Sequence, residues 1–211
     1  MCLAMKLRQW ASPIGYHIFL YGALSPSVDR VPPCRSTIPV IVTLVVTDCR
    51  RHPSSRHPIR TILEEPGRYT SATFFCGDVD EKAKKLVQVT KESLDKAISI
   101  CGAGVKYKKI GKTIHDHADK HKYGVVRQFV GHGIGRVFHS DPVVLHFRNN
   151  EAGRMVLNQT FTIEPMLTVG SIKPVMWDDD WTVITEDASL SAQFEHTILI
   201  TKHGAEILTN C

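Results

Sequence analysis

The clearest pattern of apolar positions lies between Asp80 and Gly104. From Ala83 to Cys101, apolar residues recur three or four positions apart, which is the spacing of one face of an α-helix. Asp80 is of a residue type that favours the N-cap position, and Gly102 follows the last apolar position. The pattern therefore predicts a helix that begins after Asp80 and ends near Cys101.

A second, more polar helix is predicted from about Lys108 to Lys122. Its His117 and His121 are four residues apart and share a helix face, a spacing that resembles metal ligation. Lysines surround them, however, and no glutamate stands beside the first histidine as it does in the H-E-x-x-H motif. We interpret these histidines, together with His115, as part of a solvated helix face.

Short stretches of alternating apolar and small polar residues, typical of β-strands, account for much of the rest of the chain from Thr70. Three adjacent aspartates, Asp178 to Asp180, are interpreted as a tight exposed turn in a hairpin, because such turns are far commoner than calcium sites with this pattern. Two helices among these strands predict an α/β fold. The predicted strands are Thr73–Phe75, Val125–Val130, Thr160–Leu167, Lys173–Trp177, Trp181–Thr185, Ser189–Ile200 and Ala205–Leu208.

Three ionisable residues stand in apolar or glycine-rich surroundings: His132, Glu164 and Glu195. The strand pattern indicates that Glu164 and Glu195 are each carried toward a neighbouring strand. Two carboxylates that close repel each other unless a proton or a cation lies between them. Because one imidazole and two carboxylates form a suitable ligand set for a divalent transition metal, the sequence indicates a metal site.

Residues 1–67 differ from the rest of the chain, because prolines interrupt them and no helical or strand period is sustained. Residues 1–60 hold eight Lys/Arg and two acidic residues, a balance of +6 against +5 for the whole chain, so the remainder is close to neutral. This composition fits an organelle transit segment, with a disordered segment or a segment spliced in from elsewhere as alternatives. We expect residues 1–67 to be unrelated to the domain formed by residues 68–211.

Length and composition are those of an ordinary soluble globular protein with one sizeable domain. The six cysteines are scattered without a C-x-x-C pair, which argues against a disulfide framework or a structural zinc cluster and favours a reducing compartment. The apolar run Ile38–Val46 is only about nine residues long, too short to span a bilayer. The basic N-terminal segment lacks interleaved aromatic residues, so we expect no specific nucleic-acid binding and no membrane partner.

Five motifs between Thr70 and Thr209 resemble, in order and spacing, the catalytic domain of type 1 methionine aminopeptidases of peptidase family M24, in the form found in plant organelles. The resemblance covers about the C-terminal two-thirds of that domain. It implies a "pita-bread" α/β fold with a curved antiparallel sheet and flanking helices. The motifs are Phe129–Gly135, Val137–His139, Leu145–Asn150, Phe161–Met166 and Ser189–Thr197.

The resemblance implies a metal-dependent hydrolase, a metallo-exopeptidase that removes N-terminal methionine from nascent proteins when the next residue is small and uncharged. By motif position, His132, Glu164 and Glu195 are the implied metal ligands, with Glu195 bridging two ions. The family holds two divalent ions per subunit, drawn from cobalt, manganese, iron, zinc and nickel.

The same resemblance implies that His139 and Glu164 are catalytic. Glu164 passes on a proton, and His139 hydrogen-bonds the scissile amide region. The implied substrate-binding residues are His139, Phe138 and Trp181, the last two lining an apolar pocket for the methionine side chain.

The chain also departs from the family pattern. The family takes further ligands from two aspartates and has a pocket histidine upstream, but this chain has Tyr69 at the position of the second aspartate and unrelated sequence near Pro58 at that of the first. A misread or alternatively spliced gene model that joins near Gly67 accounts for the difference most simply. We therefore expect an impaired site with at most one ion; the alternative is a non-catalytic pita-bread remnant that serves packing or partner binding.

The implied partner is the N-terminal peptide of nascent proteins, with ribosome association left open, and we expect a monomer. The resemblance and the cysteine pattern favour an intracellular location. Chloroplast, mitochondrion and cytoplasm remain the alternatives.

Overall fold

The computed structural model describes residues 18–21, 40–47, 69–76, 78–135, 139–178 and 183–209; for the first two ranges and for Tyr69 and Cys76 it describes the backbone alone. Phe138, Trp181 and two of the three turn aspartates, Asp179 and Asp180, lie outside the described residues.

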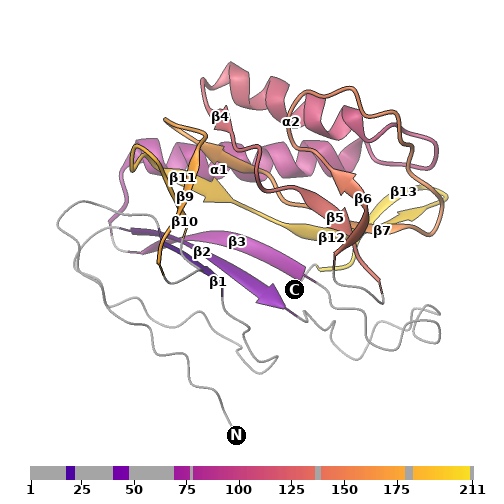
Figure 1. Cartoon of the computed structure of the whole chain (residues 1–211), viewed down its shortest axis with the longest axis horizontal. Helices are drawn as coiled ribbons and strands as arrows, with labels where there is room; N and C mark the ends of the chain where they lie inside the picture. Colours follow the sequence, from indigo (N-terminus) through magenta and orange to yellow (C-terminus); the bar gives the residue numbers. More distant parts are fainter. Residues whose placement is uncertain are drawn as a thin grey trace, which may run out of the picture.

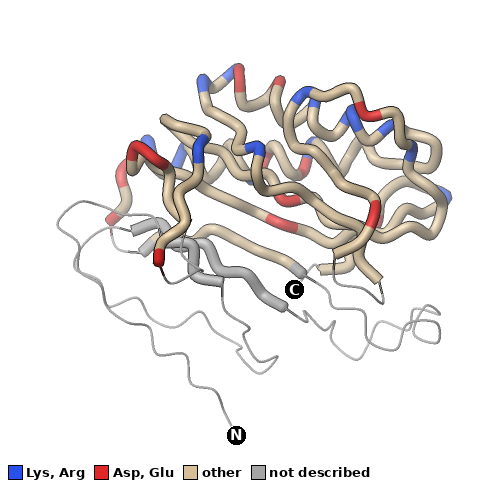
Figure 2. Tube along the Cα trace, viewed as in Figure 1, with Lys and Arg blue, Asp and Glu red and all other residues tan. Residues whose placement is uncertain are grey.

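Both predicted helices are confirmed: α1 spans Glu81–Ser99 and α2 spans Lys108–Lys120. The side chain of Asp80 accepts a hydrogen bond from the backbone N–H of Ala83 at 2.8 Å, so the predicted N-cap is also confirmed. The two helices pack against each other and lie on one side of the strands (Figure 1). Lys and Arg gather on these helices and their connecting loops, whereas the strands are mostly uncharged (Figure 2).

The described strands form four sheets, with the orders β1-β2-β3, β10-β9, β11-β8-β4 and β13-β12-β7-β5-β6. The helices cover the sheets with an apolar face that includes Leu86, Leu94, Ile110 and Ile114, all fully buried. The strands are β1 Ile18–Tyr21, β2 Val40–Thr47, β3 Tyr69–Cys76, β4 Gly124–Val125, β5 Gly131–Gly133, β6 Ser140–Val144, β7 Thr160–Ile163, β8 Met166–Thr168, β9 Pro174–Met176, β10 Val183–Thr185, β11 Ser191–Gln193, β12 His196–Thr201 and β13 Gly204–Ile207.

An interrupted antiparallel ribbon runs through the middle of the molecule. β7 pairs with β12, and the last pair of that ladder is Ile163 with His196. β8 pairs with β11, and the first pair of that ladder is Met166 with Gln193. Between the two ladders lies a gap of two residues on each side, where Pro165 has no N–H to donate to a ladder.

This gap corrects two predictions. Thr160–Leu167 and Ser189–Ile200 were each expected to form one strand, but each forms two strands that belong to different sheets. Glu164 and Glu195 lie in the gap and not within a ladder. The two carboxylates therefore come from the point at which the ribbon passes from one sheet to the other.

The predicted strand Val125–Val130 is also wrong beyond its first residue. β4 ends at Val125, and His132 lies in the separate strand β5. A Cβ atom on Gly133 would lie 2.0 Å from the backbone oxygen of Asp141, so the approach of β5 to β6 requires glycine at this position. The predicted hairpin of β9 and β10 and the closing strand β13 are confirmed.

β3 connects the N-terminal strands to the ribbon. β1 pairs in parallel with β2, and β2 pairs with β3 in an antiparallel ladder from Val40–Cys76 to Thr47–Tyr69. The apolar run Ile38–Val46 thus supplies most of β2, although no regular structure was expected before residue 68. The division of the chain at residue 67 stays a prediction.

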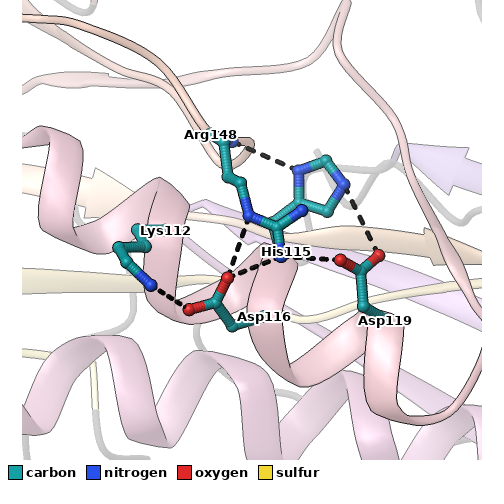
Figure 3. Close-up of polar contacts among 5 residues, drawn as sticks. All are labelled: Lys112, His115, Asp116, Asp119 and Arg148. Atoms are coloured by element: carbon teal, nitrogen blue, oxygen red, sulfur yellow. Dashed lines mark hydrogen bonds and ion pairs between the residues drawn. The ribbon is translucent and has the colours of Figure 1, made fainter.

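A polar network fastens the loop after β6 to α2 (Figure 3). The guanidinium of Arg148 donates to Oδ1 of Asp116 at 2.9 and 2.6 Å and to Oδ2 of Asp119 at 2.6 Å. The backbone N–H of Arg148 donates to Nδ1 of His115 at 3.2 Å, and Lys112 pairs with Asp116. The two aspartates of α2 therefore hold a neighbouring loop.

Within the part of the chain that the structure describes, no helix is both long and apolar enough to cross a membrane.

Candidate metal centre

His132, Glu164 and Glu195 meet at the gap in the ribbon. One ligand atom from each lies within 4.8 Å of the other two. The Nε2 atom of His132 is 3.9 Å from Oε1 of Glu164. The predicted convergence of these three residues is therefore confirmed, whereas their role as metal ligands stays a prediction.

The imidazole of His132 is held with Nε2 toward the carboxylates. Its backbone N–H donates to the hydroxyl of Thr162 at 3.0 Å. Its Nδ1 lies 3.1 Å from the carbonyl oxygen of Gly133. Because a carbonyl oxygen only accepts, this contact assigns the proton to Nδ1 and leaves the lone pair on Nε2, the form in which histidine binds a metal.

Glu164 is oriented by three polar contacts. The hydroxyl of Thr162 donates to Oε1 at 3.0 Å, and the side-chain amide of Gln193 lies 3.5 Å from Oε2. The backbone N–H of Glu164 donates to Nε2 of His146 at 3.1 Å. His146 is fully buried, and this burial lowers its pKa to about 4, so it stays neutral; its Nδ1 lies 3.3 Å from the carbonyl oxygen of Phe129.

Glu195 is fixed through its backbone by β3. The N–H of Glu195 donates to the carbonyl oxygen of Ser71 at 2.9 Å, and the N–H of Ser71 donates back at 3.3 Å. The hydroxyl of Thr70 also donates to the carbonyl oxygen of Glu195 at 2.7 Å. Glu195 is 5% exposed, so its carboxylate is taken out of water.

Burial shifts the acidity of both carboxylates. It raises the pKa of Glu164 well above its ordinary value, and the neighbouring charge of Glu195 raises it further. It raises the pKa of Glu195 to about 7. Two carboxylates with one imidazole have the donor chemistry of a divalent transition-metal site, and a cation there would compensate the negative charge that partial or full burial disfavours. The residues present therefore fit such an ion.

His139 lies beside this set but is exposed to solvent. Its ring centroid is 4.3 Å from that of His132, with the rings nearly perpendicular at 83°. This places an imidazole at the rim of the centre, and the contact of His139 with substrate stays a prediction. Phe138 and Trp181, the other predicted substrate-binding residues, are outside the described residues.

The sequence model of metallopeptidase family M24 matches residues 69–202, more than half of the chain. The chain belongs to metallopeptidase family M24.

Curated relatives in this family agree with the motifs. The chain is 88% identical over 142 residues to "Methionine aminopeptidase 1D, chloroplastic/mitochondrial" of Arabidopsis thaliana, covering 67% of this chain and 41% of that protein. It is 58% identical to "Methionine aminopeptidase 1B, chloroplastic" of the same plant, covering 67% of this chain and 38% of that protein. The chain thus spans about two fifths of the length of these relatives.

Solved structures of the M24 family agree with the fold. The methionine aminopeptidase from Rickettsia prowazekii is 45% identical with a TM-score of 0.66, over 70% of this chain and 60% of that one. The enzyme from Thermotoga maritima is 39% identical with a TM-score of 0.66, over 68% and 58%. The resemblance to type 1 methionine aminopeptidases and the predicted pita-bread α/β fold are confirmed, and this chain contains part of that fold.

Three residues that support this M24 centre were not predicted as site residues: Thr162, His146 and Gln193. Thr162 could have been predicted, since it lies two positions before Glu164 in a stretch of alternating residues, and positions two apart in an extended chain face the same way. His146 and Gln193 lie within quoted motifs, but nothing in their spacing indicates contact with Glu164. Only the fold brings them there.

One interpretation of α2 is wrong. His117 was assigned to a solvated face but is 7% exposed, and its Nε2 lies 3.1 Å from Oε2 of Glu92 on α1. Burial lowers the pKa of His117, so the neutral form is favoured. The packing of α2 on α1, which sequence spacing within one helix does not reveal, covers this residue.

Proposed function

We propose that this chain acts as a metal-dependent aminopeptidase that releases N-terminal methionine from peptides whose next residue is small and uncharged. The observation that carries the proposal is the convergence of His132, Glu164 and Glu195 within 4.8 Å, with Glu195 buried and the side chain of Glu164 only 12% exposed. Membership of the M24 family and the names of the Arabidopsis relatives support it.

The proposed cofactor is a divalent ion held by His132, Glu164 and Glu195. Cobalt, manganese, iron, zinc and nickel all suit one imidazole and two carboxylates. Such an ion, when bound, lowers the pKa of a bound water and polarises the carbonyl group that the water attacks.

The remaining chemistry belongs to the side chains. Glu164 is the proposed general base and acid, because its carboxylate borders the centre and the hydroxyl of Thr162 fixes one of its oxygens. His139 lies at the rim and is proposed to hydrogen-bond the scissile amide of the substrate. Phe138 and Trp181 are proposed from motif position to line the methionine pocket.

The proposed activity is low. Tyr69, at the start of β3, stands where the resemblance implies an aspartate ligand, and a phenol with a pKa near 10 is mostly neutral at pH 7. Three ligands and an open position suffice for one ion, not for the pair that the family holds. We therefore propose at most one ion at this centre and weak water activation.

The proposed partner is the N-terminal peptide of a nascent protein. We propose that the chain is a monomer, and we leave open whether it associates with the ribosome. We propose an organelle, chloroplast or mitochondrion, as its location. The names of the two Arabidopsis relatives support this location.

The test combines metal titration with peptide cleavage. The purified chain is titrated with Co²⁺ or Mn²⁺ by calorimetry, and release of methionine from Met-Gly-Met-Met is measured beside Glu195→Gln and an exposed control, Glu151→Gln. We expect slow release that Glu195→Gln abolishes and Glu151→Gln leaves unchanged.

Two outcomes would overturn parts of this proposal. No release with any of the ions would favour the alternative, a non-catalytic remnant that keeps the fold for packing or partner binding. Robust release that depends on Glu195, with two ions bound at the centre formed by His132, Glu164 and Glu195, would mean that other residues replace the missing aspartates.

A further inference from the structure

A second group of potential metal ligands lies between the two helices. Glu92 lies on α1, His117 lies on α2, and His121 is the residue that ends α2. One donor atom from each lies within 4.8 Å of the other two. This group shares no residue with the sheet centre, which is the set formed by His132, Glu164 and Glu195.

The distances suit a tetrahedral ion. Two donors that each lie about 2.1 Å from a zinc-type ion are about 3.4 Å apart at the tetrahedral angle. The separation of Nε2 of His117 from Oε2 of Glu92 is 3.1 Å. His121 follows His117 by four residues, and the two ring centroids are 5.1 Å apart. Small side-chain movements would therefore bring all three donors onto one ion.

The donors are also held in place by their neighbours. Gln88, one turn before Glu92, donates to Oε1 of the carboxylate at 2.8 Å, which leaves Oε2 on the side of His117. His117 is buried, so its ring has little freedom. The ring of Tyr123 stacks on His121 with centroids 6.3 Å apart. Supports of this kind orient the ligands of metal sites in proteins.

A competing cation is present at the same carboxylate. The Nζ atom of Lys96, one turn after Glu92, lies 3.8 Å from Oε2 of Glu92. Its side chain is 50% exposed and can turn away into solvent. Lys96 therefore weakens the attraction of Glu92 for a metal ion without blocking the site, and its removal is an informative test.

We propose that Glu92, His117 and His121 form a second divalent-metal site, which joins α1 to α2. Two imidazoles with one carboxylate favour zinc, nickel and cobalt over calcium and magnesium, which prefer oxygen ligands. An ion there links two helices that cover the sheets, so it stabilises the folded chain rather than taking part in peptide cleavage.

The test is a titration of the EDTA-treated and dialysed chain with Ni²⁺ by calorimetry, beside His121→Gln. This variant leaves the contact of His117 with Glu92 in place, and circular dichroism verifies that the helices are retained. We expect it to bind one ion fewer, or to bind that ion at least about tenfold more weakly. The control is His203→Gln, which removes an exposed histidine in the turn between β12 and β13 and should bind like the original chain.

Two further measurements make the test independent of loss of folding. Lys96→Gln should tighten Ni²⁺ binding at this site, a gain that misfolding does not produce. Ni²⁺ should also raise the midpoint of thermal unfolding more in the original chain than in His121→Gln. Equal stoichiometry and equal affinity in the original chain, His121→Gln and Lys96→Gln would overturn the proposal.

Discussion

Removing the charge of Glu195 should stabilise the metal-free chain at alkaline pH. Glu195 is 5% exposed, and burial raises its pKa to about 7 from the ordinary value of 4.5, which it keeps in the unfolded chain. Between these two values the folded state binds more protons than the unfolded state, so the free energy of unfolding falls as pH rises through this window. Each pKa unit corresponds to about 1.4 kcal/mol, so the full loss above pH 7 is about 3 kcal/mol.

Glutamine at this position has no carboxylate to ionise. Glu195→Gln should therefore match the original chain in stability near pH 4 and exceed it by up to about 3 kcal/mol at pH 8. Urea unfolding followed by circular dichroism in EDTA measures this, with the exposed Glu151→Gln as control. A Glu195→Gln chain that is less stable at pH 8, or a difference that does not change with pH, would refute the reasoning.

Three further changes test single contacts. Thr162→Val removes the hydroxyl that joins His132 to Glu164, and calorimetry should show metal affinity reduced by about tenfold or more, with circular dichroism unchanged. Gly111→Ala places a Cβ atom 2.1 Å from a backbone carbonyl oxygen of the neighbouring loop, so urea unfolding should show a loss of about 2 kcal/mol; no loss would contradict the packing of α2. Asp80→Ala removes the N-cap of α1 and should cost about 1 kcal/mol in the same assay, whereas Asp80→Asn should restore most of it.

The helices could be predicted because their signals are local. The apolar spacing of α1, its N-cap at Asp80 and the glycines that follow it all act within a few residues. The hairpin of β9 and β10 is predictable for the same reason, since adjacent stretches form it. His132, Glu164 and Glu195 could be predicted from their apolar or glycine-rich surroundings and from the family motifs, and the fold brings them together.

The errors share a different cause, since each depends on a partner distant in the sequence. Alternation continues through Glu164 and Glu195, so nothing local marks the place where each strand leaves one sheet for the next, except Pro165. Burial of His117 depends on α1, and the contact of His146 with Glu164 depends on how the loop after β6 folds back. Periodicity within one segment carries no information about these contacts.

The account rests most on the claim that the sheet centre holds one ion. Anomalous diffraction at the zinc edge, from a crystal of the chain grown with Zn²⁺, tests this claim most directly. We predict one peak in the centre, about 2.0–2.2 Å from Nε2 of His132 and from one carboxylate oxygen each of Glu164 and Glu195. Two peaks in this centre, or one peak that does not contact Glu195, would contradict the account.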